Sequence, residues 1–155
     1  MNKNDLNKYF KRKKIIVTGH TGFKGSWLTL SLKNLGANVL GISKNIPTKP
    51  SNYQASRINN DIQTKMIDIK NFQKLKKEIK NFEPDFIFHL AAQSLVGSSY
   101  QNPRDTWETN LIGTINILEI LKDIKKNTVV VIITSDKAYK NIEKKAGYKL
   151  SLIHI

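Results

Sequence analysis

Three glycines in the segment VTGHTGFKG lie three residues apart, after a β-branched run and at the start of a helical apolar pattern. Gly19 is placed to permit a tight turn, Gly22 to let the backbone approach a phosphate, and Gly25 to let the helix pack closely on the sheet. Free N–H groups at the start of such a helix bind anions. An ordinary strand-to-helix turn is the alternative, but this context predicts that residues 18–25 bind the pyrophosphate of a dinucleotide.

Polar residues at the ends of the predicted strands are the next candidates for ligand contacts. Dinucleotide enzymes often place an acid at the end of the second strand to bind the adenosine ribose, but Ser43 and Lys44 occupy that region here. NAD and NADP both remain open, because Lys44 would favour a ribose phosphate unless it is simply a solvated lysine. Asp68, near the end of the third predicted strand, is a candidate for the adenine side. His20 and His89 have no recognisable partner, so we interpret both as structural.

Strand and helix patterns alternate along the chain, and these elements must position the candidate residues. We predict strands at 14–18, 38–42, 86–90 and 128–133, with another within 61–69 centred on Met66 and Ile67, and helices at 24–35, 72–82 and from 103 onward. Such alternation predicts right-handed crossovers and a Rossmann-type, doubly wound parallel α/β sheet. The expected strand order is 3-2-1-4-5.

Two helices carry apolar stripes that we expect to be buried. The first helix has Trp27 on such a stripe. The helix that opens at Asn102 and Pro103 has a longer one, formed by Trp107, Leu111, Thr114, Ile115, Leu118 and Leu121. Both tryptophans are therefore predicted to belong to the core.

Length and composition narrow the class of protein further. The chain has 155 residues, enough for one domain with a single core. It has no cysteine, which removes disulfides and cysteine-ligated metals, and no histidine cluster has metal-ligand spacing, so we expect no metal. No apolar run is long enough to cross a membrane, and the N-terminus lacks the apolar core of a signal peptide. We expect a cytoplasmic protein with no membrane partner.

The net charge of +14 raises the question of a nucleic-acid partner. Only Arg12, Arg57 and Arg104 among the 26 basic residues are arginine, the residue favoured for base readout and bidentate phosphate contacts. The lysines are scattered, as the coding bias of an AT-rich genome would produce. We expect no nucleic-acid partner, although the field would attract anionic ligands.

Four segments together resemble the extended short-chain dehydrogenase/reductase superfamily and, within it, the CDP-glucose 4,6-dehydratases. They are VTGHTGFKGSWL, HLAAQ at 89–93, TNLIGT at 109–114 and ITSDKAY at 133–139. The resemblance runs from about Phe10 to Tyr148. It implies a cytoplasmic hydro-lyase of lipopolysaccharide O-antigen biosynthesis that uses NAD, has a nucleotide sugar, CDP-glucose, as its substrate, and forms a homo-oligomer.

The resemblance also implies roles for individual residues. The expected cofactor-binding residues are Gly19, Gly22, Phe23, Gly25, Ser43, Asp68, Ile69, Leu90, Ala91, Ala92 and Asn110. The expected catalytic residues are Thr134, Ser135, Asp136 and Lys137. In the implied reaction, NAD⁺ takes a hydride from sugar C4 and returns it to C6 after water has left. Asp136 would protonate the departing hydroxyl, and Lys137 would act at the C5 proton.

The sequence departs from the family at several positions, which leaves alternatives open. Ala138 stands where cysteine is common, and Ser94 with Gly97 resembles the GDP-mannose 4,6-dehydratases equally well. A GDP-mannose dehydratase and a UDP-sugar 4-epimerase are therefore the nearest alternatives. A stand-alone dinucleotide-binding regulator is a further one, which the TSDK motif disfavours.

The family's Tyr-x-x-x-Lys pair, which deprotonates the sugar hydroxyl, does not occur after Tyr139. We therefore expect an N-terminal fragment that is inactive alone, with residues 1–149 forming an incomplete NAD-binding domain and the sugar-nucleotide domain absent. Residues 150–155, LSLIHI, match the translation of a transposon-end sequencing adapter, so we expect a non-native tail.

Overall fold

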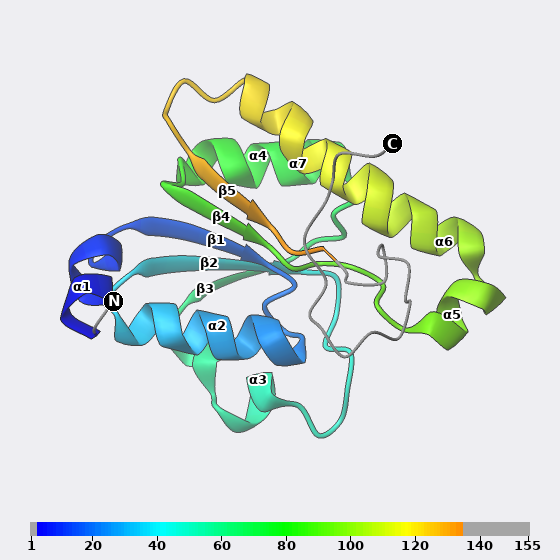
Figure 1. The fold of residues 1–155 in the computed structure, drawn as a ribbon, viewed down its shortest axis with the longest axis horizontal. Helices are drawn as coiled ribbons and strands as arrows, with labels where there is room; N and C mark the ends of the chain where they lie inside the picture. Colours follow the sequence, from blue (N-terminus) through cyan, green and yellow to red (C-terminus); the bar gives the residue numbers. More distant parts are fainter. Residues whose placement is uncertain (1–2, 135–155) are drawn as a thin grey trace, which may run out of the picture.

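Five parallel strands form one sheet in the order β3-β2-β1-β4-β5 in the computed structural model, which describes residues 3–134 (Figure 1). The strands are β1 (Lys14–Thr18), β2 (Asn38–Ser43), β3 (Gln63–Met66), β4 (Phe86–His89) and β5 (Val129–Ile132). The predicted fold class and strand order are thereby confirmed. Strand β3 is shorter than expected, because it ends at Met66 rather than being centred there.

Helices connect the strands and end where the sequence places conformational stops. They are α1 (Lys3–Phe10), α2 (Phe23–Asn34), α3 (Asn52–Ala55), α4 (Phe72–Phe82), α5 (Val96–Gln101), α6 (Pro103–Trp107) and α7 (Gly113–Lys122), with a 3-10 turn, η1 (Ile58–Asn60), and a π-helical segment, η2 (Glu108–Ile112). Gly36, with φ +77°, follows α2, and Glu83, with φ 50°, precedes Pro84 after α4. The short helices α1, α3 and α5 were not predicted.

The sheet lies between two layers of helices (Figure 1), so the core has two parts. On one face, α4 and α7 cover a cluster that includes Ile16, Ile87 and Ile117, all fully buried. On the other face, Leu32 of α2 packs against a second cluster. Phe10 of α1 completes this side, with its ring centroid 5.4 Å from that of Phe86. Burial of β1 and β2 on both faces explains the continuous apolar runs of these two strands.

The predicted burial of the long stripe is wrong. Trp107 is 68% exposed, and Leu111, Ile115 and Leu118 are also exposed. Leu121 is only half-buried, and Thr114 is also partly exposed. The buried face of α7 is instead Gly113, Asn116, Ile117 and Ile120.

Periodicity misled the prediction because α7 is apolar on two faces, and the π-helical turn shifts the phase of everything before it. Gly113 and Asn116, which are not apolar markers, are buried for specific reasons. A Cβ on Gly113 would overlap the Ile69 side chain. The Asn116 side chain donates to the carbonyl oxygen of Ile69 at 2.9 Å.

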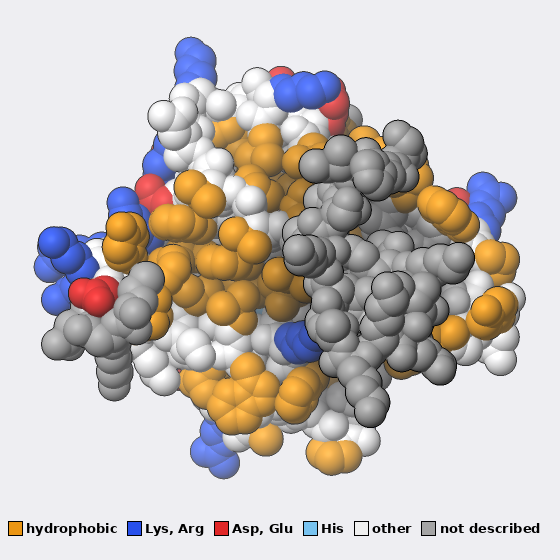
Figure 2. All heavy atoms as spheres, viewed as in Figure 1, with side chains coloured by type: hydrophobic (Ala, Val, Ile, Leu, Met, Phe, Trp, Pro, Cys, Tyr) orange, Lys and Arg blue, Asp and Glu red, His pale blue; other side chains and the backbone are white. Residues whose placement is uncertain are grey.

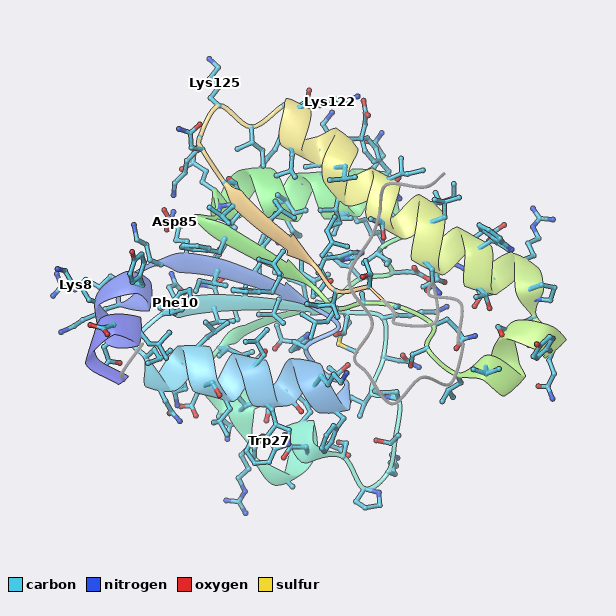
Figure 3. The ribbon with its side chains drawn as sticks, viewed as in Figure 1. Lys8, Phe10, Trp27, Asp85, Lys122 and Lys125 are labelled. Carbon is cyan, nitrogen blue, oxygen red and sulfur yellow. The ribbon has the colours of Figure 1, made fainter. Side chains whose placement is uncertain are left out.

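Trp27 is also not a core residue. It is 50% exposed, and Figure 3 shows it on the side of α2 away from the sheet. The buried residues of α2 are Gly25, Ser26, Thr29 and Leu32. Small side chains bring this helix close to the sheet, which leaves no room for an indole beneath it.

One face of the sheet remains partly uncovered around β5. Hydrophobic side chains gather over the strands in the middle of the view in Figure 2, where Figure 1 draws no helix in front of them. Val129, Val131 and Ile133 alternate toward this side and are exposed. Among residues 3–134, no helix is long and apolar enough to cross a membrane.

The face assignment of α7 is testable with two neighbouring substitutions. We expect Ile117→Ala to lower the free energy of unfolding by about 3 kcal/mol, because it opens a cavity in the core, and Leu118→Ala to lower it by less than about 1 kcal/mol. Urea denaturation followed by circular dichroism measures both. Equal losses for the two variants would contradict the assignment.

Candidate functional site

The turn between β1 and α2 is shaped by glycines whose side chains would not fit. Gly19 has φ +73°, and a Cβ there would lie 2.8 Å from the Ala91 nitrogen. A Cβ on Gly25 would overlap the carbonyl oxygen of Gly19. Helix α2 therefore begins in direct contact with the turn, as the spacing predicted. Gly22 caps α2 without a side-chain hydrogen bond.

Hydrogen bonds fasten this turn to the end of β2. The Gly19 N–H donates to the carbonyl oxygen of Ile42 at 2.8 Å. The Thr21 hydroxyl donates to the carbonyl oxygen of Asn45 at 2.6 Å, and the Thr21 N–H donates to Ser43 Oγ at 3.3 Å. The Ser43 hydroxyl therefore helps to hold the turn in place. Ser43 is one of the residues predicted to bind the cofactor, and in the structure its side chain has this structural role.

The side chain of His20 is buried beneath the turn and connects it to the end of β2. Its Nδ1 is 2.8 Å from Ser43 Oγ, and its ring meets the Tyr53 ring edge-on at 5.2 Å. The ring fills the space above Gly41, where a Cβ would overlap it. Burial lowers the pKa of His20 to about 4, so the ring is neutral at physiological pH. This environment agrees with the structural role we inferred for His20.

At the ends of β2 and β3, two predicted residues form an ion pair. Lys44 Nζ lies 3.2 Å from Asp68 Oδ2, and the other Asp68 oxygen accepts the Lys70 N–H at 2.9 Å. The Asp68 side chain remains about a quarter exposed, at 26%. Ile69 differs, because its side chain is buried against Gly113 and serves the core.

Lys70 links this loop to helix α6. Its ammonium lies 2.5 Å from Asp105 Oδ1 and 3.8 Å from Glu108 Oε2. The hydrogen bond to Asp105 is the main reason that the pKa of Lys70 is raised, and the same bond lowers the pKa of Asp105. The loop after β3 and the helix that leads to Asn110 are therefore held together at the surface.

The segment after β4 is fixed by β1 and by the π-helical turn. Thr18 Oγ1 accepts the N–H groups of Leu90 and Ala91 at 3.2 and 3.1 Å. Asn110 grips Gln93 twice, since its Oδ1 accepts the Gln93 N–H at 2.7 Å and its Nδ2 donates to the Gln93 carbonyl at 2.9 Å.

Asn110 also lines a surface hollow of about 290 Å³ together with Thr106, Trp107 and Leu111. π-helical turns of this kind are frequent at functional sites. The exposed Trp107 lies directly before this π-helical turn and lines the same hollow as Asn110.

The predicted residues meet at one edge because the strands are parallel and their carboxyl ends coincide. The structure brings together the glycine turn, Ser43, Asp68, Leu90 with Ala91, and Asn110 by the contacts above. Thr134 follows β5 and is exposed, whereas Ser135, Asp136 and Lys137 lie outside the described residues. No group of three or more potential metal-ligating side chains occurs within residues 3–134.

The sequence did not assign individual roles to Gln93 and Thr114, and it placed Thr18 in the phosphate-binding turn without predicting its bonds to the segment after β4. Thr114 belongs to the predicted apolar stripe, but its hydroxyl donates to the carbonyl oxygen of Asn110 at 2.7 Å. A threonine four residues after a helical asparagine was the available signal, because such hydroxyls bond to the preceding turn.

Comparison with known proteins places these features in a wider group. A family model described as GDP-mannose 4,6 dehydratase matches residues 16–147. The CDP-glucose 4,6-dehydratase of Salmonella typhimurium is 45% identical over 141 residues, which cover 91% of this chain and 39% of that relative.

Solved structures agree with this placement. An epimerase from Methanothermobacter thermautotrophicus aligns with a TM-score of 0.78 and 27% identity, over 94% of this chain and 42% of that one. The UDP-glucose 4-epimerase of Thermus thermophilus, in complex with NAD, aligns with a TM-score of 0.64 and 25% identity, over 72% of this chain and 34% of that one. The chain thus spans well under half the length of these relatives.

Two neutral, buried histidines predict a loss of stability in mild acid. Burial lowers the pKa of both His20 and His89 from 6.5 to about 4. The unfolded chain therefore binds more protons between these values, so stability is full above pH 6.5 and falls as the pH drops toward 4. We expect each ring to account for about 1 to 2 kcal/mol of lost stability at pH 5. Urea denaturation at pH 7.5 and pH 5 measures the loss.

The carboxylates whose pKa values are shifted do not contribute to the loss of stability between pH 6.5 and pH 4. The pKa values of Asp85, Asp105 and Asp123 are lowered from 3.8, so their contributions are present above that value and are lost at lower pH. Nuclear magnetic resonance titration of the imidazole protons assigns the effect to individual rings. A pKa near 6.5 for either buried histidine would contradict the explanation.

Proposed function

Because the chain belongs to the GDP-mannose 4,6-dehydratase family of nucleotide-sugar enzymes, we propose that it forms the NAD-binding part of a CDP-glucose 4,6-dehydratase. The resemblance expected from the four motifs is confirmed by the 45% identity to a CDP-glucose 4,6-dehydratase. The observation that carries the cofactor proposal is the glycine turn, which is closed against β2, β4 and α2 but presents an open backbone at Gly22.

The residues present fit a dinucleotide. A Cβ on Gly22 would meet only the Gly19 carbonyl oxygen, at 3.3 Å, so the space in front of this backbone is otherwise clear. The start of α2 has no side-chain cap, which suits an anion at its N–H groups. Lys44 is paired with Asp68, and this partial neutralisation of Lys44 favours NAD over a cofactor with a ribose phosphate. The related Thermus thermophilus epimerase was solved with NAD.

When bound, NAD⁺ would supply the acceptor for the hydride at sugar C4 and the donor at C6. The chain's own residues would hold it at Gly19, Gly22, Phe23 and Gly25, with Asp68 at the adenine end. Phe23 is 74% exposed at the start of α2, where a ligand can cover it. The backbone at Leu90–Ala92 and the Asn110–Gln93 pair would bound the far end of the cofactor.

The reacting groups would come from the segment that follows β5. Thr134 stands at the carboxyl edge of the sheet, and Ser135, Asp136 and Lys137 succeed it in the sequence. In the proposed elimination, Asp136 donates a proton to the hydroxyl that leaves C6, and Lys137 removes the proton from C5. The water formed contains the sugar oxygen and the proton from Asp136.

A GDP-mannose 4,6-dehydratase is the second candidate, and the description of the matching family model favours it. The two enzymes perform the same elimination and differ in the nucleotide and hexose they accept. We expect the full-length enzyme containing this chain to release water from CDP-glucose at least about tenfold faster than from GDP-mannose, an energy difference of about 1.4 kcal/mol.

Mass spectrometry of the product detects the loss of water from the sugar nucleotide. Asp136→Asn serves as the control, because it should abolish this loss while leaving NAD⁺ binding intact. Faster turnover of GDP-mannose would transfer the assignment to the second candidate.

The cofactor proposal is tested by Gly22→Ala in the 155-residue chain. A methyl group at this position requires the Gly19 carbonyl oxygen to move by only a few tenths of an ångström, but it stands where the pyrophosphate would approach. We expect the variant to keep the thermal midpoint of the parent and to bind NAD⁺ about tenfold more weakly in titration calorimetry, a loss of about 1.4 kcal/mol.

Gly97→Ala is the matched control, since a Cβ there meets nothing within 4 Å. It should change neither the thermal midpoint nor the affinity. Absence of binding by the folded parent chain, or equal affinity of Gly22→Ala and the parent, would argue against the proposal.

A further inference from the structure

A row of hydrogen bonds crosses the core from β1 to the π-helical turn. Thr18 Oγ1 lies 2.7 Å from His89 Nδ1, and His89 Nε2 lies 3.1 Å from Thr114 Oγ1. The Thr114 hydroxyl in turn donates to the Asn110 carbonyl at 2.7 Å. His89 is 3% exposed and Thr18 is fully buried, so water does not compete for the bond between these two side chains.

Counting the protons available in this row assigns a direction to each of its bonds. The Asn110 carbonyl has no proton, so Thr114 must donate to it, and the Thr114 oxygen is then free to accept from His89 Nε2–H. His89 Nδ1 consequently carries no proton and accepts the Thr18 hydroxyl. The Thr18 oxygen completes the row by accepting the N–H groups of Leu90 and Ala91.

Both ends of the row reach backbone that is proposed to touch the cofactor. At one end, Thr18 holds Leu90 and Ala91 directly after β4. At the other end, Thr114 holds the backbone of Asn110, whose side chain makes two hydrogen bonds to Gln93. The segment after β4 is therefore hydrogen-bonded to β1 on one side and to the π-helical turn on the other. His89 connects these two sets of hydrogen bonds.

We propose that His89, as its Nε2–H tautomer, is a positioning residue that sets Asn110 and the 90–93 segment against each other at the nicotinamide half of the cofactor site. The proposal rests on the proposed function for the identity of the ligand. The bridging role of His89 follows from the geometry, because an apolar side chain in its place in β4 could not join Thr18 to Thr114. Only a neutral ring with one donor and one acceptor satisfies both threonines.

The tautomer is tested in the ligand-free 155-residue chain. Nitrogen-15 spectroscopy of the imidazole at pH 7 should show a protonated Nε2 and an unprotonated Nδ1 for His89. A protonated Nδ1, or an average of the two tautomers, would overturn the proposal whether or not the chain binds NAD⁺.

The positioning role is tested with Thr114→Val, which keeps the shape of the side chain and removes its hydroxyl. We expect NAD⁺ to bind about fivefold more weakly, the factor that loss of one hydrogen bond produces, while ADP, which lacks the nicotinamide half, binds as tightly as to the parent chain. Thr114→Ser should restore NAD⁺ affinity.

Thr128→Val is the matched control, because the Thr128 hydroxyl bonds to the Pro84 carbonyl at 2.9 Å, at the opposite end of the sheet. It should alter neither ligand's affinity. Equal weakening of NAD⁺ and ADP by Thr114→Val would show a merely structural role and overturn the proposal, as would no weakening of either. If the folded parent binds neither ligand, the cofactor proposal fails, and the tautomer measurement alone decides the arrangement of the row.

Discussion

Helix α2 starts against the carbonyl oxygen of Gly19, and this contact shapes the carboxyl edge of the sheet, where we propose that the cofactor binds. The approach is so close that Gly25 has no room for a Cβ. It directs the first N–H groups of α2 toward the carboxyl ends of the strands, where a charged ligand benefits from them. Hydrogen bonds to the carbonyl oxygens of Ile42 and Asn45 hold this glycine turn on one side. The backbone of Ala91 packs against Gly19 on the other side.

The polar interior beneath this edge is built from hydroxyls and two neutral imidazoles. His20 joins the turn to the end of β2, and His89 joins β1 and β4 to α7. Neither ring has a carboxylate within hydrogen-bond distance among its described contacts, so burial governs its pKa without opposition from a nearby negative charge. Hydroxyl partners satisfy the rings without adding a buried charge, whose desolvation would be costly. Both histidine rings beneath this edge are therefore uncharged at neutral pH.

The sequence was sufficient for the parts of the fold in which local pattern and tertiary environment agree. Buried parallel strands are continuous apolar runs, and Gly36 and Pro84 stop helices for local steric reasons, so these elements were predicted nearly to the residue. The glycine turn was also predicted correctly, because its conformation requires glycine at Gly19 and Gly25.

The failures arose where burial depends on a partner that local periodicity does not reveal. The buried face of α7 is recognised only through Ile69, which lies far away in the sequence yet packs on Gly113 and bonds to Asn116. Trp27 was misplaced because α2 packs through small residues. The contacts of Thr18 and Thr114 with His89 likewise join residues that only the tertiary fold brings together, although the resemblance had already singled out Asn110.

The π-helical turn at Glu108–Ile112 contains one residue more than an α-helical turn needs. Each residue of an α-helix turns the chain by about 100°, so this one residue offsets the face of α6 from that of α7 by roughly the same angle. Loss of a single codon here would let one straight helix run through. Asn110 would then swing away from Gln93 while the exposed apolar surface rotated with it. The carboxyl edge of the sheet and the outer surface of this helix are therefore coupled through the π-helical turn, and one insertion or deletion there would change both at once.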